Sequence, residues 1–217
     1  MLSFTEENYL KAIYHLSQDG DSPVLTNDLA KSVKTKAASA TDMIRKLASK
    51  KLIGYKKYYG ATLTAKGKAA ALMVIRKHRL WETFLVQKLG FLWSEVHEVA
   101  EQLEHIQSRR LIERLDEFLD FPRTDPHGDP IPDQNGKIFQ PAAISCDQLK
   151  EGKPSSIIAV KDSSNSLLML LDKIGAHPGK KIKIIGREPF DQSLEVLLDG
   201  QKVFLSSEVA KNILVKE

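Results

Sequence analysis

The chain of 217 residues is 42% hydrophobic and 28% charged, which is typical of a globular protein and excludes a disordered or membrane-embedded one. No apolar run approaches the ~20 residues of a spanning helix, and the first residues lack the basic and apolar regions of an export signal. The single cysteine, Cys146, excludes an internal disulfide framework and favours a reducing cytoplasm.

The net charge of +4 conceals an uneven distribution along the chain. Residues 1–80 hold 15 Lys and Arg against 6 Asp and Glu, whereas residues 81–150 hold 7 against 13. Residues 151–217 are nearly balanced, with 10 against 9. The basic first third indicates a polyanionic partner, and the acidic middle third indicates a cation.

The first third predicts a winged helix-turn-helix. Apolar periodicity indicates helices over residues 5–17, 26–33 and 37–50, with Thr5 and Thr26 as the expected N-caps of the first two. Two β-prone runs around a turn that ends at Gly60 then predict a hairpin. In such a fold the third helix enters the DNA major groove and the hairpin touches the backbone or minor groove.

The residues predicted to contact DNA are polar, cationic or aromatic side chains of the helix pair and the hairpin tip. They are Thr26, Lys36, Ser39, Thr41, Asp42, Arg45, Lys46, Lys56, Lys57 and Tyr58. The alternative is a three-helix core whose charged face is merely solvated.

A long helix is predicted over residues 65–88, with His78 and Glu82 one turn apart on one face. Its second half is rich in apolar and aromatic residues, and this surface continues to Trp93. Such a surface is either core or a subunit interface, and we expect a two-fold interface because dimers commonly read two DNA half-sites.

Residues 94–108 predict a further helix with an unusual polar stripe, formed by His97, Glu101, Glu104 and His105. The segment contains four glutamates and neither Lys nor Arg, so helical neighbours cannot offset the repulsion. Carboxylate and imidazole together can bind Mn, Fe, Co, Ni or Zn. The alternative is a solvated acidic face.

The rest of the chain predicts a helix over 109–119, a proline-stiffened loop over 121–137 and short β runs over 155–217. The loop can hold Asp125, His127 and Asp129 in place. The β runs predict a five-stranded SH3-like barrel. The expected fold is therefore mainly α with a small β-barrel, in three domains: a winged helix-turn-helix at 1–70, a helical metal-binding and dimerisation domain at 71–141, and a linker with the barrel at 142–217.

Several segments together resemble the diphtheria toxin repressor family of metal-dependent transcriptional regulators. They are T-E-E-N-Y-L-K-A-I-Y at 5–14, L-T-A-K-G at 63–67, R-K-H-R-L-W-E at 76–82, V-H-E-V-A-E-Q-L-E-H at 96–105 and D-P-H-G-D-P-I-P at 125–132. The resemblance covers the chain in order, including a C-terminal FeoA-like, SH3-like barrel. It implies a cytoplasmic homodimer, not an enzyme, that binds operator DNA when loaded with Mn²⁺ or Fe²⁺ and represses metal-uptake genes.

The resemblance also implies two metal sites in each subunit. One set is Asn8, Glu101, Glu104 and His105. The other is His78, Glu82, His97, Asp125 and His127, with Asp162 from the barrel as a further candidate.

Three departures from the family pattern bear on the metal and on DNA. Iron-type members commonly carry Cys at position 101 and Met at position 8, and the absence of sulfur here favours Mn²⁺ over Fe²⁺. Manganese-type members commonly have Asp at position 8, so the neutral Asn8 leaves Fe²⁺ open. Lys11 replaces an acid and would repel a second cation. Lys36-Ala37-Ala38 replaces a common Ser-Pro-Pro at the recognition helix, so the operator cannot be inferred.

Two other functions remain open from the residues alone. A metal-independent winged-helix regulator would carry the Glu/His stripe as plain surface. A metallohydrolase would use the same cluster for catalysis, but the sequence has no H-E-x-x-H motif and no evident Ser or Cys nucleophile motif.

Overall fold

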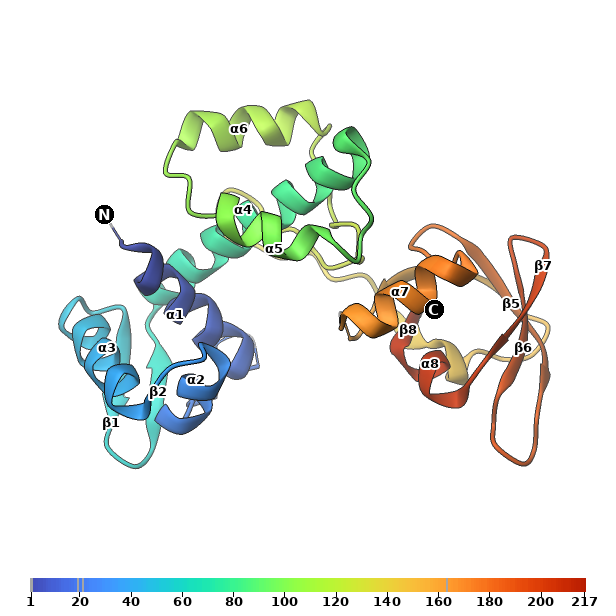
Figure 1. The fold of residues 1–217 in the computed structure, drawn as a ribbon, viewed down its shortest axis with the longest axis horizontal. Helices are drawn as coiled ribbons and strands as arrows, with labels where there is room; N and C mark the ends of the chain where they lie inside the picture. Colours follow the sequence, from blue (N-terminus) through green and yellow to red (C-terminus); the bar gives the residue numbers. More distant parts are fainter. Residues whose placement is uncertain (1, 19, 21, 163) are drawn as a thin grey trace. The chain divides into compact units, whose positions relative to one another are not determined.

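The computed structural model describes residues 2–18, 20, 22–162 and 164–217. The chain forms two compact units, and Figure 1 labels their helices and strands. The first contains residues 1–78, 103–107 and 132–137, and the second contains residues 79–102, 108–131 and 138–217.

The first unit begins with three helices and a hairpin. Its elements are α1 (Phe4–Leu16), α2 (Thr26–Ser32), α3 (Ala37–Ser49), β1 (Ile53–Lys56) and β2 (Gly60–Leu63), followed by α4 (Ala65–Leu89), which continues into the second unit. β1 and β2 pair antiparallel, with Ile53 opposite Leu63. The predicted winged helix-turn-helix and the long helix are confirmed.

The two predicted N-caps were wrong. α1 begins after Ser3, whose hydroxyl accepts the backbone N–H of Glu6 while the Glu6 carboxylate accepts the N–H of Ser3. This reciprocal capping box satisfies two backbone donors, which Thr5 inside the helix cannot do. α2 is preceded by Leu25, and Thr26 is already helical.

The core of the three-helix domain consists of aliphatic side chains at helical spacing. Leu10, Ile13, Leu29, Ile44 and Leu47 are each completely buried. Burying a side chain of this size contributes roughly 1.5–3 kcal/mol. The packing leaves the polar sides of α3 and the hairpin exposed.

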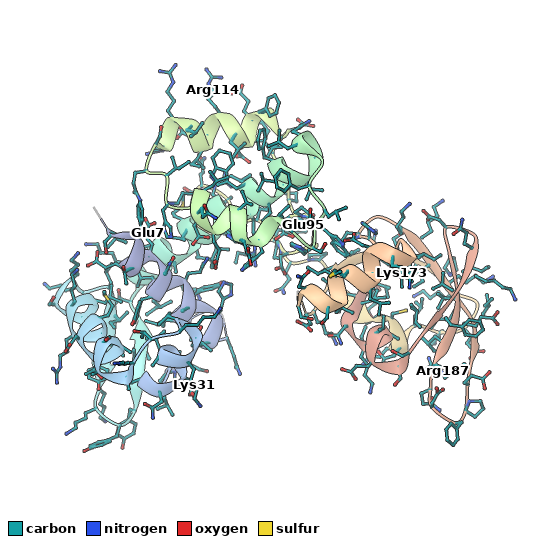
Figure 2. All side chains as sticks on the ribbon, viewed as in Figure 1. Glu7, Lys31, Glu95, Arg114, Lys173 and Arg187 are labelled. Carbon is teal, nitrogen blue, oxygen red and sulfur yellow. The ribbon has the colours of Figure 1, made fainter. Side chains whose placement is uncertain are left out.

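Helix α5 (Val96–Leu103) is shorter than the helix predicted over 94–108, and α6 spans Arg109–Phe118 with Ser108 as its N-cap. Glu104 and His105 therefore lie beyond the end of α5, and the prediction that they share a helical stripe with His97 was wrong. Both side chains make long-range contacts, which are described below. α6 presents its charged side outward, and Figure 2 shows Arg114 extending away from it.

The C-terminal part of the second unit is an antiparallel sheet with helices between its strands. The elements are β3 (Ala143–Ser145), the 3-10 turn η1 (Cys146–Gln148), β4 (Pro154–Val160), α7 (Asn165–Ile174), β5 (Lys181–Arg187), β6 (Leu194–Leu198), β7 (Gln201–Leu205), α8 (Ser207–Asn212) and β8 (Ile213–Lys216). The strand order is β3-β8-β4-β5-β6-β7.

The predicted closed five-stranded barrel is therefore corrected to an open six-stranded sheet in the part of the chain that the structure describes. β3, which is only three residues long, pairs with β8 alone, and β7 pairs with β6 alone, so both remain edges. Bulges in the β4–β8 and β5–β6 pairs bend the sheet without closing it.

One aromatic residue joins the helical part of the second unit to the sheet. Trp93, which follows α4, is buried in the same apolar cluster as Cys146, Ile157, Leu171 and Ile213. The sheet core thus includes a side chain from outside the C-terminal segment. None of the helices among the described residues is long and apolar enough to cross a membrane.

Candidate metal centre and DNA-binding surface

Glu82 on α4 is the centre of a buried group of metal-ligand types in the second unit. Its Oε2 lies 3.8 Å from His127 Nδ1, and its Oε1 lies 3.5 Å from His97 Nδ1. His127 Nδ1 in turn lies 4.0 Å from Asp125 Oδ1. One ligand atom from each of Glu82, Asp125 and His127 lies within 4.8 Å of the others.

The tautomer of His127 is fixed by the backbone of Trp93. His127 Nε2 lies 2.8 Å from the Trp93 carbonyl oxygen, which can only accept, so Nε2 carries the proton. Nδ1, which is the unprotonated nitrogen whenever the ring is neutral, faces Glu82 and Asp125. Hydrogen bonding of the outer nitrogen is how proteins commonly orient a metal-binding imidazole.

The charges around Asp125 favour a cation. Burial, the nearby charge of Glu82 and that of Asp129 raise the pKa of Asp125 well above its ordinary value, although Arg79 opposes this. Arg79 lies 3.5 Å from Asp125 and 3.4 Å from Asp129. Asp125 also accepts the backbone N–H groups of His127 and Asp129, which holds the loop in one conformation.

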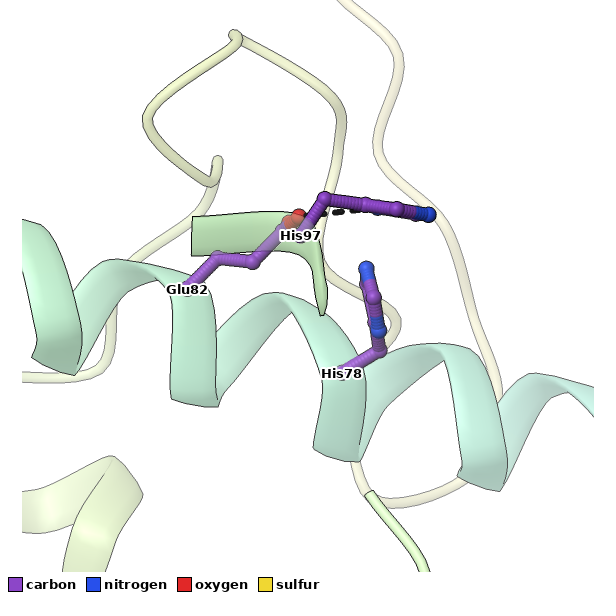
Figure 3. A group of neighbouring side chains, drawn as sticks. All are labelled: His78, Glu82 and His97. Carbon is purple, nitrogen blue, oxygen red and sulfur yellow. Dashed lines mark ion pairs between the residues drawn. The ribbon is translucent and has the colours of Figure 1, made fainter. Parts of the chain in front are cut away.

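Figure 3 shows His78, Glu82 and His97, whose ligand atoms also lie within 4.8 Å of one another. His78 ends the first unit, but it lies on the same continuous helix as Glu82, one turn away. His97 comes from α5 and is largely exposed. Glu82 thus belongs to both groups, with imidazoles on its two oxygens.

The surroundings of Glu104 are different. Lys11 Nζ from α1 lies 2.7 Å and 2.8 Å from its two carboxylate oxygens, and His78 Nδ1 lies 2.6 Å from Oε2. Burial raises the pKa of Glu104, but the hydrogen bond from His78 and the charge of Lys11 outweigh burial, so the pKa lies below its ordinary value. Glu104 is therefore an ionised carboxylate with its counter-charge inside the protein.

His105 is held by a second carboxylate of α1. Its Nδ1 lies 2.7 Å from Glu7 Oε2, its Nε2 lies 3.7 Å from Glu104 Oε1, and its ring stacks on Phe4. Glu7 also accepts a hydrogen bond from Gln107 and lies 3.7 Å from Lys77 Nζ. The ring position therefore depends on Glu7, which the sequence reasoning did not consider.

The first predicted metal set, Asn8, Glu101, Glu104 and His105, does not form a ligand group among the residues that the structure describes. Asn8 is exposed on α1, and Glu101 is half-exposed, with Oε1 3.5 Å from His97 Nε2. In the second set, Asp162 is exposed and accepts hydrogen bonds from the N–H and hydroxyl of Ser164. The other five fall into two groups of three that share Glu82: His78, Glu82 and His97, and Glu82, Asp125 and His127.

The residues predicted to contact DNA lie on α2, α3 and the hairpin (Figure 1). Lys36, Ser39, Asp42, Arg45, Lys46, Lys56, Lys57 and Tyr58 are exposed, and Thr26 and Thr41 are half-buried. At the hairpin tip Lys57 Nζ lies 5.0 Å from the ring centroid of Tyr58, which has a positive φ of 68°. Lys46 also pairs with the buried Glu6 at 3.1 Å, so this side chain has a structural role as well.

Sequence reasoning missed the residues that position the ligands. Arg79 and the Trp93 carbonyl carry no signal in a pattern of ligand types, because one is a cation and the other is backbone. Lys11 was noted only as a charge that repels cations, and its partner Glu104 is 93 positions away.

The comparisons with known proteins agree with the geometry. Residues 1–61 match the family model "Iron dependent repressor, N-terminal DNA binding domain", residues 64–133 match "Iron dependent repressor, metal binding and dimerisation domain", and residues 145–217 match "FeoA domain". The iron-dependent repressor IdeR of Mycobacterium tuberculosis strain H37Rv is 35% identical over 192 residues, covering 83% of each chain.

The chain belongs to the family of metal-dependent transcriptional repressors. A diphtheria toxin repressor of Corynebacterium jeikeium is 30% identical to this repressor over 152 residues. The match covers 70% of this chain and 58% of the relative. A solved manganese-dependent transcriptional repressor in complex with manganese has a TM-score of 0.81 and 36% identity, covering 98% of this chain and 99% of its own. The structure of ScaR with bound Cd²⁺ has a TM-score of 0.74 and 32% identity, with 98% and 99% covered.

Proposed function

We propose that this repressor binds double-stranded operator DNA as a homodimer when a metal ion occupies the group formed by Glu82, His97, Asp125 and His127, called the Glu82 group below. The ion is Mn²⁺, with Fe²⁺ as the alternative. The repressor acts in the cytoplasm, on metal-uptake genes, and catalyses no reaction. Residues 1–70 read DNA, residues 71–141 bind metal and form the dimer, and residues 142–217 carry the FeoA domain.

The observation that carries the proposal is the pair of buried carboxylates, Glu82 and Asp125, facing one side of His127. A bound divalent cation would supply the positive charge that offsets them. Glu82, His97, Asp125 and His127 would hold it, with His78 one turn away on α4 as a further ligand. The carboxylate oxygens suit Mn²⁺, the imidazoles also suit Fe²⁺, and the set contains no thiolate, the ligand that selects softer metals.

The DNA-reading surface is supported by the exposed cations of α3 and the hairpin. Arg45 and Lys46 can bind phosphate, and Ser39 and Asp42 can reach base edges. A homodimer would place two such helices about one DNA turn apart, ~34 Å. Exposed apolar side chains on α6 and the loop after it, Leu111, Phe118 and Phe121, are candidates for the dimer contact.

Metal can raise DNA affinity only if it binds the DNA-competent conformation more tightly than the incompetent one. The coupling free energy between metal and DNA binding is typically ~1–3 kcal/mol. The ligands of the Glu82 group come from α4, α5 and the loop with Asp125 and His127. A bound ion would hold these segments together and so restrict the conformations of α4, which continues directly from the DNA-reading domain. We propose that this restriction makes metal binding favour the DNA-competent conformation.

An operator-binding titration with Mn²⁺, Fe²⁺ and Zn²⁺ side by side tests the proposal. The DNA is selected from a random pool, once with Mn²⁺ and once with chelator. We expect Mn²⁺ to raise the affinity roughly 5–150-fold. Equal affinity with each metal and with chelator would favour the metal-independent regulator instead.

A further inference from the structure

Glu104 has an ion-pair partner of its own within the first unit. Its carboxylate is completely buried, and the Lys11 ammonium lies at hydrogen-bond distance from both oxygens. The Lys11 side chain is itself largely buried, with 14% of its surface exposed. An ammonium held by both oxygens of a carboxylate takes the position that a bound cation would need.

Each of the two buried carboxylates at this place has an ammonium partner among the described residues. The buried carboxylates of Glu7 and Glu104 face the ammonium groups of Lys77 and Lys11. His78 and His105 donate through Nδ1 to Glu104 and Glu7, so neutral imidazoles satisfy the geometry. A dication bound to Glu104 would lie beside the largely buried Lys11 ammonium, and like charges that are close and buried repel strongly.

We propose that Lys11 is a built-in cation that replaces a metal ion at Glu104, so that each chain binds one regulatory metal ion, at the Glu82 group. The ion pair ties α1 to the segment after α5 whether or not metal is present. This inference rests on the proposed function only for the ion at the Glu82 group. The set Asn8, Glu101, Glu104 and His105 then gains a metal only when the lysine charge is removed.

The first test measures stability without metal, and it does not depend on the Glu82 group. Lys11→Met keeps the length of the side chain and removes its charge, leaving Glu104 buried with less compensation. With chelator we expect its melting temperature to fall by roughly 5 °C or more. An unchanged melting temperature would overturn the proposal, because the ion pair would then contribute nothing.

The second test counts Mn²⁺ per chain by equilibrium dialysis for the wild type, Lys11→Met and Lys11→Glu. We expect one ion in the wild type and a second in Lys11→Glu, which offers a new carboxylate beside Glu104. If Lys11→Glu does not fold, Lys11→Met still tests the proposal. With Mn²⁺ in excess, we expect the melting temperature of Lys11→Met to recover part of the decrease measured with chelator. Failure of both variants to gain binding would overturn the proposal.

Lys50→Met is the matched control, since Lys50 also pairs with a buried carboxylate of α1, Glu6, at 2.6 Å, and no imidazole contacts this pair in the part of the chain that the structure describes. It should lose stability without gaining an ion. The ion counts separate the two proposals. A wild type that binds no ion while Lys11→Glu binds one refutes the Glu82 site and leaves this inference standing, whereas a wild type with two ions, one lost on Glu104→Gln, refutes this inference alone.

Discussion

The ionised form of Asp125 lies in unfavourable electrostatic surroundings. Asp125 is buried, its pKa is raised, and its closest cationic partner, Arg79, is shared with Asp129. Groups held in unfavourable surroundings are often the ones that act in binding, because the ligand relieves the cost.

The substitution Asp125→Asn separates stability from metal binding. The amide oxygen can still accept the N–H groups of His127 and Asp129, while the negative charge beside Glu82 is lost. We expect the metal-free protein to melt a few degrees higher at pH 7–8 and Mn²⁺ affinity to fall by roughly 10-fold or more. Thermal melting with chelator and equilibrium dialysis measure the two effects. A variant that melts lower in chelator and binds Mn²⁺ as before would contradict this reading.

Glu6 gives the DNA-reading domain a dependence on pH. Burial raises its pKa, but the hydrogen bonds from Lys50, the Ser3 backbone and Lys46 outweigh burial and lower the pKa from 4.5 to about 2. A depressed carboxyl pKa contributes stability that is present above the unfolded-state value and is lost as the pH falls from about 4.5 to about 2.

We therefore expect Glu6→Gln to destabilise the protein by roughly 3 kcal/mol at pH 7, since each pKa unit corresponds to about 1.4 kcal/mol. The difference from the wild type should shrink as the pH falls toward about 2. Urea unfolding at several pH values measures this. The exposed Glu151→Gln is the control, and an equal effect of both variants would show that the contacts of Glu6 are not responsible.

At the scale of elements, the loop that carries His127 is fixed against strand β4. The backbone N–H of Val160 donates to the His127 carbonyl, and Gly128 has a φ of +90°. A Cβ at Gly128 would lie 2.0 Å from the Ile158 carbonyl oxygen, whereas a Cβ at Gly152, φ +78°, would meet nothing within 4 Å.

The pair Gly128→Ala and Gly152→Ala isolates this contact. Both variants pay the cost of a left-handed residue, roughly 1–2 kcal/mol. We expect only Gly128→Ala to lose more stability and also to weaken Mn²⁺ binding, because the loop must move with His127. Chemical denaturation and dialysis provide the comparison. Equal losses in the two variants would mean that the loop is not held by this close approach.

Helix α3 allows a prediction on DNA. If Arg45 binds phosphate, Arg45→Ala should weaken binding to all sequences alike and reduce the salt dependence by about one unit of slope. Lys202→Ala, which removes an exposed cation from β7, should leave affinity unchanged. Fluorescence anisotropy at several salt concentrations measures both. A loss confined to one sequence would instead place Arg45 at a base edge.

The elements with strong periodicity could be predicted, and those decided by distant contacts could not. The long helix and the hairpin follow from local pattern, and the structure confirms them. The end of α5 could not be predicted, because Glu104 is drawn to Lys11 and His78 by contacts far apart in the sequence. The strand β3 was missed because it is only three residues long and has no local signal.

At the scale of the whole molecule, one of the two predicted ligand sets forms groups around Glu82, and the other does not form a ligand group among the described residues. His78 and Glu82 are fixed by one helical turn, and the proline loop indicated Asp125 and His127. Which carboxylates face a metal and which face lysine depends on tertiary packing. The structure pairs Glu104 with Lys11, whereas Glu82 lies between the imidazoles of His97 and His127. Because of this contrast, we place the regulatory metal ion at the Glu82 group.

The most direct measurement is the DNA affinity of the wild type and of Glu82→Gln, each at saturating Mn²⁺ and with chelator, with the exposed Glu98→Gln as control. We expect Mn²⁺ to raise the affinity of the wild type and the control roughly 5–150-fold and that of Glu82→Gln by less than about 2-fold. A Glu82→Gln repressor that responds to Mn²⁺ as strongly as the wild type would contradict the claim that the Glu82 group is the metal switch.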